Sequence, residues 1–341
     1  MSETRKLQRI GGNTLYVSLP KRWTSRMQLK KGDKVTLTPQ LDDSLFIYPT
    51  ARKERPREIL LEINATDSSQ SLKRGIRAAY VDGFDIIKLK AEERLTEEIE
   101  DAIREIVDHL FGLEVIELTG NTITIQCLLK QTLPIEKTIQ RIHNVILSMF
   151  HETVSALKSQ DVTFAKSLAR RMHDIKRLLL VTNRLLRSLI LFPSSADHQE
   201  VSFIDCVDYL RILHIIAEIA DNVNKISESV MALSEQALPE SILRPLCQTC
   251  IPIQDVYDQA IQALLSKDIS LANRVLDSKL TVENLWKLCI EADEHSKISC
   301  LALSHTYLLV DNLKQITRYA GEIAEIAIDQ AEAGMKSSLT R

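Results

Sequence analysis

The chain has 341 residues, of which 45% are hydrophobic and 26% are charged, and its formal net charge is −3. This length allows roughly two or three domains that each bury a core without disulfides, and six cysteines scattered through apolar sequence indicate reduced thiols. The sequence has no apolar segment near its start and no run of about eighteen apolar residues, so it favours a cytoplasmic protein without membrane insertion over a secreted or membrane-spanning one.

The small net charge hides a basic N-terminal end. The first 55 residues contain twelve Lys or Arg against five Asp or Glu, an excess of +7 that the acidic remainder offsets. Seven of the nine glycines lie at or before Gly120, and long segments free of Gly and Pro begin after Pro134. We therefore expect mixed secondary structure in the first third of the chain and helices in the last two thirds.

Residues 5–48 have the alternating pattern of short strands. Apolar residues alternate at Leu15, Val17 and Leu19, at Val35 and Leu37, and at Leu45 and Ile47. Between the strands Pro20 opens a brief helical turn, KRWTSRM, and Gly32-Asp33 supplies a turn before the next strand. Such a small unit buries too little surface to be stable alone, so a homodimer or a higher oligomer is expected.

Three pieces of this segment occur in a known order: basic residues before a Gly-containing strand, the LPKRW step and the LKKGDKV turn. With them the segment resembles the AbrB/SpoVT-like swapped-hairpin domain, in which two chains interleave hairpins into one barrel and present Arg and Lys to DNA. The resemblance implies that the DNA-binding residues are Arg5, Lys6, Arg9, Lys21, Arg22 and Arg26. A basic patch on a small dimer is independently typical of a phosphate-backbone binder. The alternative, that these charges only solvate a dimerisation module, stays open.

Residues 56–131 alternate between strand and helix patterns. Strands are expected at 58–65, 84–91, 113–119 and 121–129, and helices at 68–83 and 95–112. Ser68 and Thr96 are candidate N-caps, and Gly83 and Gly112 end the two helices. The order predicts a β-α-β-α-β-β sandwich. It contains no Gly-rich phosphate loop, so a structural spacer is favoured over a small-molecule sensor.

The remaining sequence has helical spacing and repeats itself. Helices are expected at 135–158, 162–191, 203–233, 253–265, 270–304 and, after a short break, 308–335. The third of these carries an apolar seam at Tyr209, Ile212, Ile216, Ile219, Val223, Ile226, Val230 and Leu233. The same register recurs at Leu309, Leu313, Ile316, Ala320, Ile323 and Ala327. The junctions also repeat, as ALKSQDVTFA and ALLSKDISLA, with Asp161 and Asp268 as caps. Two successive three-helix bundles are predicted, at about 135–236 and 250–336.

The repeated ALxxxDxxxA junction, Asp174 and Asp277, and the third-helix sequences IAEIADNVNKISE and LKQITRYAGEIAE make this part similar to the PhoU family. That family's domain is a tandem pair of three-helix bundles. The resemblance implies a regulator of phosphate uptake that works with phosphate transporters and signalling partners. Several members bind metal clusters through an acidic pair in the third helix.

The acidic pair is altered in this chain. The family glutamate is replaced by Ala217 and Lys314, and the family aspartate remains as Asp221 in the first copy. In the second copy the aspartate is replaced by Arg318. A metal cluster needs several converging carboxylates, and a cation at a ligand position repels the metal, so no metal and no other cofactor is expected. Asp221 and Arg318 are instead predicted to form an ion pair across the groove between the bundles, with Lys314 beside them.

The sequence as a whole predicts a multidomain protein. A swapped-hairpin β-barrel spans 1–50, the α/β sandwich spans 56–131, and an all-α PhoU-like pair of three-helix bundles spans 135–341. The single CxxC, at Cys247 and Cys250, has no second pair, and no catalytic triad is recognisable, so an enzyme is disfavoured. The predicted function is a DNA-binding transcriptional regulator of phosphate uptake. The alternative is an interaction protein that docks on a phosphate transporter or signalling partner and uses its barrel only to dimerise.

Overall fold

The computed structural model describes residues 3–9, 14–39, 43–49, 56–64, 66–129, 134–159, 163, 165–191, 202–234, 238–278 and 299–339. The chain forms two compact units, Met1–Pro56 and Arg57–Arg341. The observed order, a small strand region followed by a mixed sheet and a helical bundle region, confirms the predicted fold class at this level.

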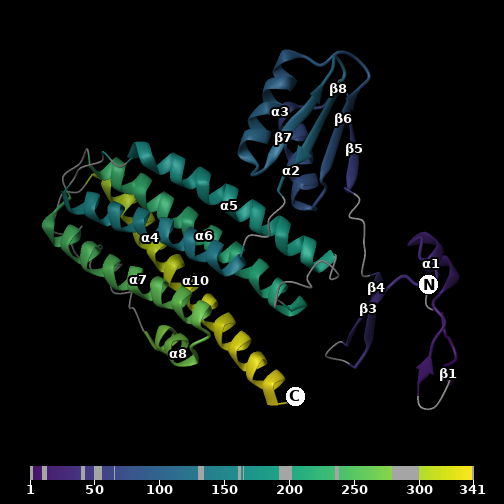
Figure 1. Ribbon diagram of the computed structural model, residues 1–341. Helices are drawn as coiled ribbons and strands as arrows, with labels where there is room; N and C mark the ends of the chain where they lie inside the picture. Colours follow the sequence, from purple (N-terminus) through teal and green to yellow (C-terminus); the bar gives the residue numbers. More distant parts are fainter. Residues whose placement is uncertain are drawn as a thin grey trace. The chain divides into compact units, whose positions relative to one another are not determined.

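The N-terminal unit consists of two short hairpins and one short helix. Its elements are β1 (Gln8–Arg9), β2 (Leu15–Tyr16), α1 (Lys21–Arg26), β3 (Val35–Pro39) and β4 (Leu45–Pro49). The strands pair as antiparallel β1-β2 and β3-β4 hairpins (Figure 1). Helix α1 begins directly after Pro20, whose fixed φ suits a helix start, and Gly32 adopts the positive φ that its turn requires.

The second unit opens with a four-stranded mixed sheet. Its elements are β5 (Glu58–Ile63), α2 (Ser69–Val81), β6 (Ile86–Ala91), α3 (Glu97–His109), β7 (Leu113–Leu118) and β8 (Thr122–Cys127). The strand order is β5-β6-β8-β7, in which β5 and β6 are parallel and the other neighbours are antiparallel. The predicted β-α-β-α-β-β order is confirmed. Successive residues of β5 and β6 alternate between exposed and more buried positions, so one face of this sheet packs on a core.

Local signals in the sequence define both helices of this sheet domain. The Ser68 hydroxyl accepts a hydrogen bond from the Ser71 N–H at 3.2 Å, and the Thr96 hydroxyl accepts one from the Ile99 N–H at 3.4 Å. Gly83 and Gly112, which follow the helices, both have positive φ. These caps explain why the predicted ends agree closely with the observed ones.

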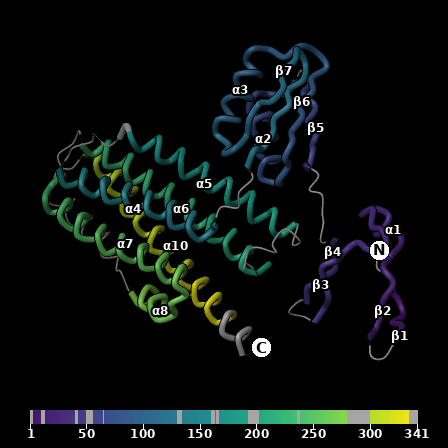
Figure 2. Tube along the Cα trace, in the orientation of Figure 1, coloured from purple at the N-terminus to yellow at the C-terminus, as the bar shows by residue number. Residues whose placement is uncertain are grey.

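The helical region begins at residue 135 and forms one continuous hydrophobic core. Its helices are α4 (Ile135–Ser159), α5 (Ala165–Leu191), α6 (Phe203–Leu233), α7 (Glu240–Ser266), α8 (Ile269–Asp277) and α10 (Cys300–Leu339). Helices α6 and α10 pack side by side (Figures 1 and 2). Every residue of the repeated apolar seam is buried, with at most 6% of its surface exposed. The seam of α6 and its copy in α10 therefore form the centre of the core.

Two of the predicted helix boundaries were wrong. The helix expected to begin at 253 begins at Glu240, because α7 continues through Pro245 and Pro252 in the segment where the prolines indicated a loop. A proline inside a helix costs about 3 kcal/mol. Each fully buried aliphatic side chain stabilises the fold by roughly 1.5–3 kcal/mol. Because α7 buries Ile242, Leu246 and Ile253, this burial offsets the cost of the prolines. The break expected between 304 and 308 is also absent, since α10 runs through these residues.

Parts of the prediction lie outside the described residues. These are most of the helix expected at 270–304, from residue 279 to residue 298, and the cap at Asp161. The matching cap at Asp268 is described and confirmed, because its carboxylate accepts the Leu271 N–H at 3.0 Å. Within the described residues, no helix is long and apolar enough to cross a membrane.

Candidate nucleic-acid interface and bundle sites

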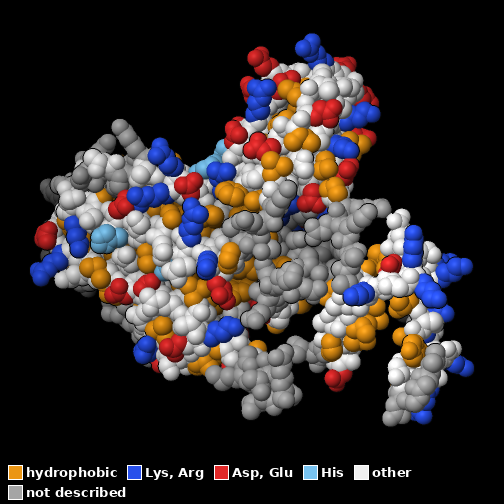
Figure 3. All heavy atoms as spheres, viewed as in Figure 1, with side chains coloured by type: hydrophobic (Ala, Val, Ile, Leu, Met, Phe, Trp, Pro, Cys, Tyr) orange, Lys and Arg blue, Asp and Glu red, His pale blue; other side chains and the backbone are white. Residues whose placement is uncertain are grey.

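All six predicted DNA-binding side chains are exposed on the N-terminal unit. They are Arg5, Lys6 and Arg9 at and before β1, and Lys21, Arg22 and Arg26 on α1. Figure 3 shows Lys and Arg side chains over this unit together with hydrophobic ones. Arg5 forms an ion pair with Glu3 at 2.5 Å, but both side chains are about two-fifths exposed, so the pair is weak and leaves Arg5 available. The arrangement offers cations to a polyanion without fixing any base contact.

The same unit exposes much of its apolar surface. Tyr48 is its buried hydrophobic side chain among the described residues. Leu37 and Leu45, which share one face of the β3-β4 hairpin, are 54% and 53% exposed, and Leu7 is 65% exposed. Exposed apolar side chains that share one face of a hairpin are typical of an interaction surface. The described part of this unit therefore lacks a closed hydrophobic core.

On the bundle, the predicted ion pair between Asp221 and Arg318 does not form among the described residues. Arg318 pairs instead with Glu322, one turn along α10, with Nη1 2.6 Å from Oε1. Its guanidinium also lies 4.2 Å from the centre of the Tyr319 ring. The prediction placed Arg318 opposite α6 by sequence register, but an acidic residue four positions away on the same exposed helix face is a nearer partner.

The residues at the family's metal positions do not fit a metal cluster. Asp221 on α6 is half-buried, Ala217 carries no donor, and Lys314 on α10 is exposed and cationic. Within the described residues, no group of three or more His, Cys, Asp or Glu side chains converges as a metal site would require. This donor set supplies too few carboxylates for a multinuclear site.

The CxxC pair lies on the buried side of α7. Cys247 and Cys250 are 7% and 1% exposed, and both are free thiols. Burial raises the pKa of both thiols, that of Cys250 to about 12. A reactive or metal-binding cysteine needs a stabilised thiolate, so these two are core residues.

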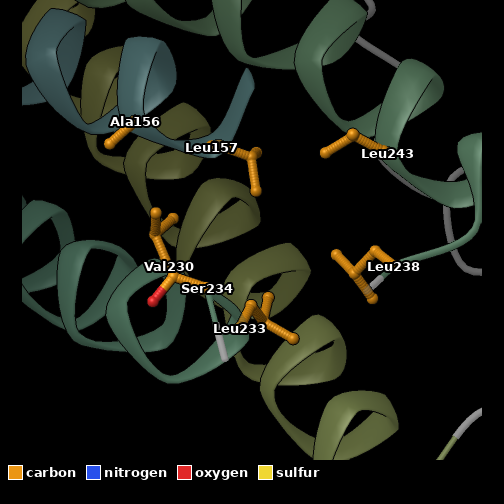
Figure 4. Close-up of a pocket in the computed structure, with 7 residues that line it drawn as sticks. All are labelled: Ala156, Leu157, Val230, Leu233, Ser234, Leu238 and Leu243. Atoms are coloured by element: carbon orange, nitrogen blue, oxygen red, sulfur yellow. The ribbon is translucent and has the colours of Figure 1, made fainter. Parts of the chain in front are cut away.

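Two hollows lie near the N-terminal end of α7. The first holds only about 10 Å³, no more than one water, and is mainly apolar (Figure 4). It is lined by Ala156, Leu157, Val230, Leu233, Ser234, Leu238 and Leu243. The second is an open groove of about 340 Å³. Its lining, which contains two cations and one carboxylate, consists of Lys158, Glu240, Leu243, Arg244, Cys247, Gln248 and Ile251. Neither hollow presents a set of convergent polar groups, so neither is assigned a ligand.

The most extensive polar contact in the described second unit joins α5 to the sheet domain. Arg184, on α5, has a side chain that is only 10% exposed and forms an ion pair with Asp85 at 3.1 Å. Nearby, Arg187 pairs with Asp82 at 2.5 Å, and the rings of His173 and His109 meet edge to face with centroids 4.5 Å apart. Helix α5 is therefore covered on two sides, by the bundle and by the sheet domain.

Sequence reasoning did not identify this junction. The sequence feature that indicates this junction is the stretch LLLVTNRLLRSLIL. Its apolar residues occupy more than one helix face, and Arg184 and Arg187 lie among them. A helix that is apolar on two sides has two buried faces, and an arginine within such a surface needs a buried partner.

Comparison with known proteins gives two family matches. Residues 139–230, from within α4 to near the end of α6, match the PhoU domain. The chain contains a PhoU domain. Residues 8–55 match the family described as antidote-toxin recognition MazE, bacterial antitoxin. The N-terminal unit is thus MazE/AbrB-like, and the predicted family resemblances are confirmed.

A solved structure extends the likeness of the PhoU domain in fold. PhoU from Pseudomonas aeruginosa is 15% identical and matches with a TM-score of 0.50, over 59% of this chain and 96% of that chain. The phosphate transport system regulatory protein PhoU from Streptococcus pneumoniae is 16% identical, with a TM-score of 0.49, over 59% of this chain and 94% of that one. A search of curated protein sequences found no match.

Proposed function

We propose that the protein is a homodimeric DNA-binding regulator of transcription that acts in phosphate uptake. In this proposal two copies of the MazE/AbrB-like unit bind DNA together. The PhoU domain senses or docks a component of the phosphate-transport or signalling machinery, without enzymatic activity of its own. Binding at the bundle changes the arrangement of the paired N-terminal units and hence their affinity for DNA.

The observation that carries the proposal is the combination of charge and apolar surface on one small unit. Its first 55 residues have a charge excess of +7, and the six candidate cations are exposed. The apolar side chains around Leu37 and Leu45 are also exposed, which is costly unless a second copy covers them. Dimerisation doubles the number of cations on one particle, and phosphate-backbone affinity rises with each cation that releases a counterion.

The phosphate-uptake part of the proposal rests on the PhoU domain. The match at 139–230 extends from α4 to α6, and the buried apolar seam of α6 recurs in α10. The presence of this seam in two helices supports a regulatory role like that of the family. The family's metal positions have diverged, which favours a protein partner over a metal as the signal.

An alternative function is supported by the same apolar surface. If the N-terminal unit only dimerises, its exposed leucines have a role without any DNA, and the protein is an interaction partner of a transporter or signalling protein. The two functions differ in what the basic residues do. Only the regulator requires Lys21 and Arg22 to contact phosphates.

Charge variants at two places separate these functions. The variant Lys21→Gln/Arg22→Gln removes two exposed cations from each N-terminal unit, and Arg170→Gln/Lys176→Gln removes two exposed cations from α5 as a matched control. Fluorescence anisotropy with DNA from the gene's own promoter region measures the DNA affinity of each variant. We expect the N-terminal variant to lose affinity at least about tenfold and the control to stay within about twofold. Equal affinities for the two variants would favour the alternative.

A further inference from the structure

Residues Asp82–Asp85 form the connection from α2 to β6, and α5 holds this loop from one side. Nη1 of Arg184 donates hydrogen bonds to the carbonyl oxygens of Tyr80 at 2.6 Å and of Phe84 at 2.9 Å. Its Nη2 donates to Oδ1 of Asp85 at 3.1 Å. One largely buried guanidinium therefore fixes three points of the chain, and hydrogen bonds from a charged donor in such a setting are among the strong ones.

Arg57 holds the same loop through its backbone and its side chain. Its N–H donates to Oδ2 of Asp85 at 2.9 Å, and its carbonyl accepts the N–H groups of Asp85 at 2.8 Å and Ile86 at 3.0 Å. The Arg57 side chain donates to the Asp82 carbonyl at 2.5 Å and lies 4.4 Å from the centre of the Phe84 ring. Arg57 is the first residue of the second unit. The loop therefore holds the chain at the point where the second unit begins.

The two arginines meet at one carboxylate. Asp85 accepts Arg57 at Oδ2 and Arg184 at Oδ1, so neither arginine can shift without disturbing the contact of the other. Gly83 keeps the loop tight, because it has a φ of 82° and a Cβ there would lie 3.2 Å from the Arg57 guanidinium. Arg187, which is also on α5, forms an ion pair with Asp82 of the same loop.

We propose that this loop is a coupling device that transmits displacement of α5 to Arg57, where the N-terminal linker joins the second unit. Helix α5 is part of the PhoU domain, with Ile175 and Leu186 fully buried in its core, so rearrangement of the bundle moves α5. The contacts of Arg184 carry that movement to Asp85, and Asp85 carries it to Arg57. This proposal deepens the proposed function and rests on it for the consequence at DNA, but the mechanical link is a property of the second unit alone.

Hydrogen-deuterium exchange of the full-length protein without DNA tests the link. The variant Arg184→Gln removes the charge at the loop. Arg171→Gln is its matched control on the same helix, because Arg171 pairs with Glu152 inside the bundle at 2.8 Å. We expect Arg184→Gln to raise exchange at least about tenfold both at residues 82–86 and at the Arg57 amide, and Arg171→Gln to leave both unchanged.

Two results would overturn the coupling. One is faster exchange at 82–86 with an unchanged Arg57 amide, and the other is no change at either place. If Arg184→Gln does not fold, Arg187→Gln removes the more exposed ion pair with Asp82. This variant is expected to raise exchange at residues 82–86 and at the Arg57 amide by a smaller factor. Because no DNA is present, failure of this link and failure of DNA binding are distinguishable.

Discussion

Nε2 of His143 lies 2.8 Å from Oδ1 of Asp258, and this pair joins helix α4 to helix α7. His143 is only 1% exposed, and its ring meets that of Tyr257 edge to face, with centroids 4.9 Å apart. Asp258 is further held by Gln262, whose Nε2 lies 2.6 Å from Oδ2. Helices α4 and α7 are thus connected by a specific polar contact as well as by apolar packing.

Loss of this contact should destabilise the bundle pair. We expect His143→Gln to lower the free energy of unfolding at about pH 8 by roughly 1–3 kcal/mol, because it disturbs a buried hydrogen bond. Urea unfolding at fixed protein concentration measures the change. Arg141→Gln, at an exposed position of the same helix, is the control and should change stability by less than about 0.5 kcal/mol.

The same histidine predicts a pH dependence. Burial lowers the pKa of His143, and the bond to Asp258 only partly opposes this effect. A folded-state pKa below the unfolded value of about 6.5 means that the stabilisation is complete above about pH 6.5 and is lost as pH falls toward the folded pKa. The stability difference between the native chain and His143→Gln should therefore narrow between about pH 8 and pH 5. A constant difference across that range would contradict the assignment.

Removal of Arg318 should have little effect. Its side chain is 52% exposed and its ion pair with Glu322 lies within one helix, so Arg318→Ala is expected to cost no more than about 0.5 kcal/mol. Thermal and urea unfolding measure the change in the free energy of unfolding. A loss of about 2 kcal/mol or more would indicate that Arg318 pairs across the bundles with Asp221 in solution.

The exposed leucines of the N-terminal unit predict its oligomeric state. Leu37→Asp should convert the proposed dimer largely to monomer, because a carboxylate would be buried in its interface without a partner. Leu60→Asp is a close control, since Leu60 is also 54% exposed but lies on the sheet domain. Analytical ultracentrifugation reports the outcome. A Leu37→Asp variant that sediments as the native dimer would rule out this surface as the dimer interface.

The altered acidic positions predict a protein without a stoichiometric metal cluster. Elemental analysis of the purified protein by mass spectrometry should find iron, zinc and manganese at well below one equivalent per chain. Restoring the acids with Lys314→Glu/Arg318→Asp supplies a gain-of-binding comparison. One or more equivalents in the native chain would mean that carboxylates outside the family positions hold the metal.

Several features were predictable from sequence because one strong local signal determines them. The bounds of α6, Phe203–Leu233, were predicted to the residue, since Ser202 forms a capping box with Asp205 and the apolar seam runs without interruption. The repeat of that seam likewise predicted the buried face of α10. In both cases, residues close in the sequence determine the structure.

The failures involve burial that depends on distant parts of the chain. Pro245 and Pro252 read as helix breakers, but the core that covers Leu246 and Ile253 keeps them within α7. Arg184 was not identified from the sequence, because its partner Asp85 lies about one hundred positions away and belongs to a different fold element. The pairing of Arg318 was also missed, since register alone cannot rank Asp221 against a nearer glutamate.

The central claim is that paired basic N-terminal units bind DNA, and the salt dependence of binding tests it most directly. Affinity of the intact protein for DNA from its own promoter region should be measured from about 50 mM to 300 mM salt. The account predicts binding at low salt whose logarithm falls linearly with the logarithm of salt concentration, with a slope of about −5 or steeper if six or more phosphates are contacted. Negligible binding at the lowest salt, or affinity that does not change with salt, would contradict it.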